Sequence, residues 1–169
     1  MDCTGPGPPP PRGAMAYTVT GCVEYEGGVA KDGDLPTPDG KTGARLSDGD
    51  TNTSVRCSIS SSPDGGYLVD LNLSGPNVDA AIPAESAGLV VGLEIHGTVT
   101  ADGGSGQVIL RAMQTFESSA PCTLNAAGDQ GFEIGHNRVY GTFECDEMRT
   151  TDGLTCMAFG VFAFDLCPP

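Results

Sequence analysis

Apolar and polar residues alternate along most of this chain, which is typical of strands with one buried face. Residues 16–28 carry Tyr17, Val19, Val23 and Tyr25 at positions of one parity, and we predict one strand there. Further alternating segments are separated by Gly-, Pro-, Asn- and Asp-rich turns. Helix-period patterns are almost absent from the chain.

A hairpin is predicted from residues 54–60 and 66–75, because the intervening Ser-Ser-Pro-Asp-Gly-Gly supplies turn geometry. Its two inward faces are expected to carry Val55, Cys57 and Ile59, opposed by Tyr67, Val69, Leu71 and Leu73.

A second hairpin is predicted from residues 88–101 and 106–118, with its turn at residues 102–105. Glu94 and Arg111 fall on its outward positions. The expected inward positions are Leu89, Val91, Leu93, Ile95 and Val99.

The chain therefore predicts about eight or nine short strands with a turn about every ten residues, which favours an antiparallel β-sandwich. A closed β-barrel is the alternative. We expect a Pro-rich N-terminal tether over residues 1–15 and a single sandwich domain over residues 16–169.

Two further strands, at residues 139–145 and 156–166, carry Cys145 and Cys156 at their adjoining ends. Placing these cysteines opposite each other also sets Phe143 opposite Ala158 and Gly141 opposite Gly160 on one apolar face. A shift of one residue would break both matches, so we predict a Cys145–Cys156 disulfide.

The remaining internal cysteines are assigned to the pairs Cys122–Cys167 and Cys22–Cys57, although six cysteines allow fifteen connectivities. Buried free thiols are the alternative. The chain has no C-x-x-C motif, and its two histidines form no ligand pair, so the pattern does not favour a zinc or thioredoxin-like site. Seven cysteines in 169 residues favour an oxidising compartment.

The net negative charge of the chain argues against anionic binding partners. The formal net charge is −14 with only 8 Lys and Arg residues, so we expect no nucleic-acid binding and no attraction to anionic lipid. No run of eighteen apolar residues is present. The first residues lack the apolar segment of a signal peptide, and we expect that such a peptide has been removed.

The seventh cysteine, Cys3, precedes five prolines within residues 6–11. Such a run adopts an extended polyproline conformation and acts as a semi-rigid spacer. This arrangement resembles the mature N-terminus of bacterial lipoproteins, which implies lipidation of Cys3. An untethered tail with a spare thiol is the alternative.

The longest irregular segment, residues 27–53, is rich in acids. Asp48, Asp50 and Asn52 follow the spacing that begins an EF-hand loop, but Thr53 and Ile59 replace its required glycine and glutamate. A looser calcium cage that adds Asp32, Asp34 or Asp39 remains an alternative to a solvated loop.

No catalytic residue is assigned. The chain has no G-x-S-x-G, H-E-x-x-H or P-loop motif. His96 is expected on an outward face beside Glu94, and His136 in a turn. The absence of tryptophan argues against a sugar-binding site.

The C-terminal pattern Gly141-Thr142-Phe143…Cys145…Cys156…Gly160-Val161-Phe162…Cys167, together with the proline tether, resembles small disulfide-bonded β-sandwich lipoproteins of bacterial envelopes. The resemblance implies an extracytoplasmic location: outer membrane, periplasm or cell surface, with membrane contact only through a lipid anchor.

We therefore expect a non-enzymatic surface or periplasmic module that binds an unknown protein or surface ligand, or that serves a structural role. We expect no cofactor, except calcium if the calcium-dependent alternative holds. A calcium-dependent adhesion or matrix module and a hydrolase whose acids are assembled by the fold are the alternatives.

Overall fold

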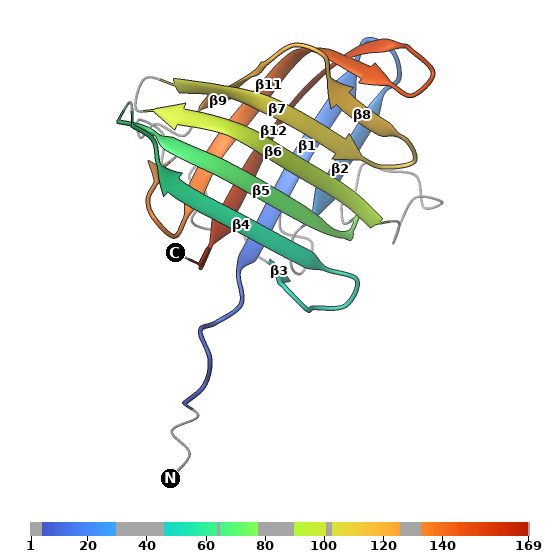
Figure 1. The fold of residues 1–169 in the computed structure, drawn as a ribbon. Helices are drawn as coiled ribbons and strands as arrows, with labels where there is room; N and C mark the ends of the chain where they lie inside the picture. The colour runs from blue at the N-terminus through green and yellow to red at the C-terminus, as the bar shows by residue number, and fades with distance from the viewer. Residues whose placement is uncertain are drawn as a thin grey trace.

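The computed structural model describes residues 5–29, 46–63, 65–77, 90–100, 103–125 and 133–168. Within these ranges the chain forms twelve β-strands and no helix (Figure 1). The strands are β1 (Arg12–Thr20), β2 (Tyr25–Val29), β3 (Leu46–Ser47), β4 (Ser54–Ser61), β5 (Tyr67–Pro76), β6 (Val90–Thr100), β7 (Gly103–Arg111), β8 (Thr115–Ser118), β9 (Cys122–Asn125), β10 (Glu133–Ile134), β11 (Val139–Thr150) and β12 (Thr155–Asp165).

All strands belong to one antiparallel sheet with the order β2-β1-β12-β11-β8-β7-β6-β5-β4. The sheet folds over into two layers: β4 to β7 form the front layer in Figure 1, and β1, β2, β11 and β12 lie behind them. The short strands β8 and β9 join the layers, because each pairs with both β7 and β11. The predicted all-β sandwich is confirmed.

The two predicted hairpins are confirmed as β4–β5 and β6–β7. The turn predicted at residues 102–105 was wrong, because residues 103–105 belong to β7 and pair with residues 98–100 of β6. Across the first, Val55 lies opposite Leu73, and Cys57 opposite Leu71. In the second, Leu93 and Ile95 are fully buried, whereas Glu94 is directed to the outer face. Leu89 lies outside the described residues.

Some predicted strands are divided by turns. Residues 16–28 form two strands, because Gly21 adopts a φ of 88° and turns the chain between β1 and β2. A turn at residues 112–114 likewise separates β7 from β8. The single strand predicted at each place was wrong, because the alternation of apolar and polar residues does not reveal a short turn within a segment.

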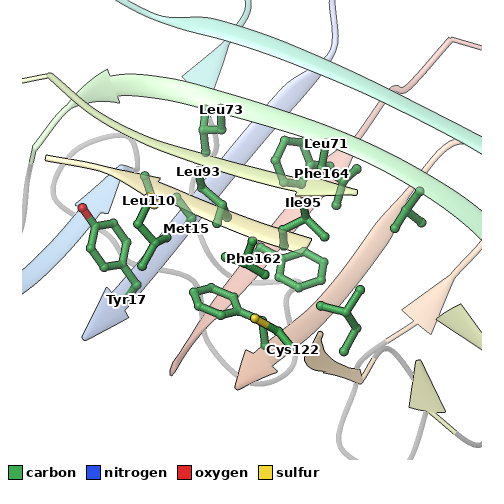
Figure 2. Close-up of a cluster of buried hydrophobic side chains, with 14 of the residues drawn as sticks. Met15, Tyr17, Leu71, Leu73, Leu93, Ile95, Leu110, Cys122, Phe162 and Phe164 are labelled. Atoms are coloured by element: carbon green, nitrogen blue, oxygen red, sulfur yellow. The ribbon is translucent and has the colours of Figure 1, made fainter. Parts of the chain in front are cut away.

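The interior of the sandwich is filled by large apolar side chains from both layers (Figure 2). Leu71, Leu93, Ile95 and Leu110 come from the front layer, and Met15, Phe162 and Phe164 from the back layer. The alternating side chains that the sequence assigns to one face of each strand thus meet across the two layers.

The predicted register of β11 against β12 was wrong by two residues. Phe143 lies opposite Gly160, and Cys145 lies opposite Ala158. A bulge after Cys145 then brings Met148 opposite Cys156. A shift of two residues keeps every side chain on its predicted face, so alternation alone does not distinguish the two registers.

Six cysteines form three disulfides, as predicted, but all three predicted pairings were wrong. The bonds are Cys22–Cys156, Cys57–Cys167 and Cys122–Cys145. The first ties the β1–β2 turn to β12, the second joins the two layers, and the third links β9 to β11. These bonds indicate that the chain folds in an oxidising environment.

The chain enters the sandwich at Arg12, which lies inside the range 1–15 assigned to the tether. Arg12 donates from Nε and Nη2 to the two carboxylate oxygens of Asp165, at 2.9 and 2.8 Å, and so joins the start of β1 to the end of β12. The carboxylate raises the pKa of Arg12. Residues 5–10 are exposed and lead away from the sandwich (Figure 1).

Cys3 lies outside the described residues. The described ranges contain no helix with the length and apolarity needed to cross a bilayer.

Candidate binding surface

The acids proposed for calcium hold a turn between β3 and β4. Asp48 Oδ1 accepts a hydrogen bond from the Val55 amide at 3.0 Å, and Asp50 Oδ2 accepts one from the Ser47 amide at 2.9 Å. Asn52 has a φ of 54° in the same turn. Within the described ranges no group of three or more His, Cys, Asp and Glu side chains is placed to hold a metal ion. Asp32, Asp34 and Asp39 lie outside those ranges, so the looser cage stays a prediction.

The two histidines lie apart. His96 Nδ1 lies 3.1 Å from Asp70 Oδ1 on the outer face of the front layer, where both side chains are well exposed. Glu94, its expected companion, instead pairs with Arg111 and accepts a hydrogen bond from Asn72. His136 makes an edge contact with the Tyr67 ring, at 5.8 Å between ring centres.

Exposed apolar side chains gather at one end of the sandwich. Met113 is 75% exposed in the β7–β8 turn, and Val90 is 50% exposed at the start of β6. Gly92 pairs with Arg111, which places the start of β6 and the β7–β8 turn at the same end of the sheet. Leu154 is exposed in the β11–β12 turn at the same end.

A hollow of about 370 Å³ opens at this end, between the β1–β2 turn and the β7–β8 turn. Val23, Glu24 and Tyr25 line one side of it, and Ala112, Met113 and Phe116 line the other. Its lining is thus mainly apolar, with the Glu24 carboxylate and the Gln114 amide as polar groups. We call this hollow, together with Val90 and Leu154, the apolar end.

Tyr17 packs against the tyrosine that lines the hollow. Its ring centre lies 6.0 Å from that of Tyr25. Its hydroxyl donates to the Arg111 carbonyl at 3.4 Å, and burial raises its pKa well above the usual range. Only glycine fits at position 27, because an added Cβ there would lie 2.6 Å from Tyr17 Cζ. This close packing holds β1 and β2 in place beside the hollow.

Two shallower hollows lie on either side of Ser118 and Ser119, with volumes of about 340 and 510 Å³. Hydroxyl, amide and charged side chains line them. The nearby Glu147 accepts a hydrogen bond from Ser119 Oγ at 2.7 Å, which together with Arg149 lowers the pKa of that carboxyl group. None of these three hollows contains a histidine or two acids.

Val90, Met113 and Leu154 were not predicted as binding residues from the sequence. Each lies at a strand end or in a turn, where a single apolar residue has no periodic neighbours to mark it. The segment predicted to be irregular, residues 27–53, begins within β2 and contains β3, and its residues 30–45 lie outside the described residues.

Comparison with protein-family models, with curated proteins and with solved structures found no match to this chain.

Proposed function

We propose that this protein is a non-enzymatic binding module of the bacterial cell envelope, anchored through a lipid on Cys3, that engages a protein or surface ligand with its apolar end. The observation that carries the proposal is the position of the apolar end relative to the tether. The three disulfides support an extracytoplasmic location.

The tether and the apolar end lie at opposite ends of β1. The tether joins the sandwich at Arg12, whereas Thr20, eight residues later, leads into the turn that lines the hollow. At about 3.3 Å per residue, the strand separates the two by roughly 26 Å. A domain held at its N-terminus would therefore present the apolar end away from the membrane.

The composition of the apolar end favours binding over catalysis. Its hollow combines aliphatic and aromatic walls with one carboxylate, which suits an apolar group and offers no acid–base pair. Contiguous exposed apolar side chains commonly mark interaction sites.

Nile red, a neutral dye whose fluorescence rises in apolar surroundings, tests the apolar end directly. We expect the folded protein to bind the dye, and Met113→Ser to weaken binding about fivefold, as expected for the loss of ~1 kcal/mol of apolar contact. Leu68→Ser is the matched control, since Leu68 is 47% exposed near the opposite end of the sandwich. No binding by the wild-type protein, or equal losses in both variants, would contradict the proposal.

Anchoring is tested separately by mass spectrometry of the intact protein from its native membrane fraction. Lipidation predicts added acyl mass on the peptide that contains Cys3. An unmodified Cys3 that reacts with iodoacetamide without prior reduction would exclude the anchor.

A further inference from the structure

The outer face of the back layer carries a second apolar feature, distinct from the apolar end. Met157 and Phe159 alternate on β12 and are 51% and 53% exposed. β12 lies between β1 and β11, so both side chains stand in the interior of the sheet face. Thr20 and Thr18 of β1 are their neighbours on one side. We call Met157 and Phe159 the β12 ladder.

Carboxylates flank this ladder on both sides. The cross-strand row reads Glu26–Thr18–Phe159–Glu144, from β2 through β1 and β12 to β11. With strands about 4.8 Å apart, Glu144 is adjacent to Phe159 and Glu26 lies roughly 10 Å away on the other side. Asp146 continues the outward positions of β11 beside Met157, and it is exposed.

No described lysine or arginine is paired with these acids. Among the residues that the structure describes, Glu26, Glu144 and Asp146 make no ion pair or side-chain hydrogen bond. Glu94 on the outer face of the front layer is paired instead, with Arg111. The carboxylates beside the β12 ladder thus differ from Glu94 in having no paired arginine or lysine among the described residues.

We propose that the β12 ladder and its flanking carboxylates bind an extended basic segment of a partner polypeptide. In that segment, Lys or Arg and apolar residues both occur among the every-second-position side chains that face the sheet. Apolar side chains of that segment would cover Met157 and Phe159, while its cations reach Glu144 and Glu26. In an extended chain, side chains at every second position point to the same side, so cations and apolar groups that share one parity can all face the sheet.

Electrostatics favours this partner over the other occupants. The net charge of −14 attracts a basic chain over long range and increases its association rate. A second copy of this chain would bring its own unbalanced acids to the same face, and an anionic membrane would be repelled. A basic polypeptide can both pair its cations with the carboxylates and cover the β12 ladder with apolar side chains.

A short synthetic peptide in which Lys and Leu take turns at every second position, with Ser at the positions between them, is a direct probe. Its binding is followed by isothermal titration calorimetry. We expect binding that weakens strongly between about 50 mM and about 500 mM salt. A peptide with Glu in place of Lys should not bind, and one with Ser in place of Leu should bind at least tenfold more weakly. Equal binding of the Leu and Ser peptides would overturn the proposal, because it would show attraction to the net charge alone.

Matched substitutions locate the site. Glu144→Gln and Phe159→Thr should each weaken binding about five- to tenfold. Asp70→Asn makes the same change of charge on the front layer and should alter affinity by less than twofold. An equal effect of Asp70→Asn and Glu144→Gln would overturn the proposal.

Threonine is favoured in strands, so Phe159→Thr should keep the fold. If the thermal unfolding midpoint of Phe159→Thr falls, Met157→Thr is the second variant to test. If Met157→Thr is stable and binds the peptide as the wild type does, the ladder has no role. Met113→Ser, which tests the apolar end, should leave peptide binding unchanged, so the two proposals fail independently.

Discussion

Phe143 on β11 lies directly opposite Gly160 on β12, and its ring occupies the space where a side chain at position 160 would stand. An added Cβ at Gly160 would lie 2.7 Å from Phe143 Cε1. The next inward pair is the reverse, with Gly141 opposite Phe162. Both phenylalanines are almost fully buried. The Phe143 ring thus covers Gly160 on the neighbouring strand, and this contact favours the observed register.

Gly160→Ala should therefore destabilise the fold by roughly 1–3 kcal/mol, as overpacking does. The added methyl group would meet the Ala16 carbonyl oxygen at 2.4 Å as well as the Phe143 ring, and backbone does not yield as a flexible side chain can. Urea unfolding measures the loss. Gly135→Ala is the control, because an added Cβ there meets nothing within 4 Å. Equal stability of the two variants would contradict the Phe143–Gly160 contact.

Peptide mapping of the unreduced protein should recover the bonds Cys22–Cys156, Cys57–Cys167 and Cys122–Cys145. Replacing both cysteines of one bond by serine should cost about 2–5 kcal/mol. In the loop-entropy model, loss of Cys57–Cys167 should exceed loss of Cys122–Cys145 by about 1.4 kcal/mol, because it closes a longer loop. Recovery of a linked Cys145–Cys156 peptide would contradict the register as well as the connectivity.

The buried Tyr17 hydroxyl predicts loss of stability at high pH. Burial raises the pKa of Tyr17 above its usual 10.0, so above that pH the unfolded chain loses this proton while the folded chain keeps it. The stabilisation is complete below pH 10.0 and should fall by up to ~1.4 kcal/mol per pH unit above it.

Urea unfolding at about pH 9 and about pH 11 should show a smaller loss for Tyr17→Phe than for the wild type. Near neutral pH, Tyr17→Phe loses only a 3.4 Å hydrogen bond, so its free energy of unfolding should differ from that of the wild type by less than ~1 kcal/mol. Tyr67→Phe is the control, since Tyr67 is half-buried. Identical pH dependence of the wild type and Tyr17→Phe would contradict the buried hydroxyl.

Calcium binding by Asp48, Asp50 and Asn52 predicts that the thermal unfolding midpoint is higher in calcium than in EDTA, because a ligand that binds only the folded state stabilises it. Asp50→Asn should abolish that difference, while its side-chain oxygen can still accept the hydrogen bond from Ser47. An unchanged midpoint in the wild-type protein would exclude the calcium-dependent alternative.

Much of the fold could be predicted from the spacing of side chains. Val55, Cys57 and Ile59 face inward because alternation has a period of two, and the same parity placed Glu94 and Arg111 outside. The ladder residues Met157 and Phe159 belong to the outward parity of the strand predicted at residues 156–166. What no spacing could show is that Glu26 and Glu144, far apart in sequence, lie on either side of them.

The sequence by itself determined which face of each strand is buried, that the strands form a sandwich, and that six cysteines are bridged. Only the tertiary structure decided which residues oppose one another and which cysteines pair. A shift of two residues in strand pairing leaves every side chain on the same face, so the alternation cannot fix the pairing. A disulfide requires two Cα atoms within about 7 Å, and that distance depends on strand order. Cys57 meets Cys167 only because the folded sheet brings β4 near the end of β12.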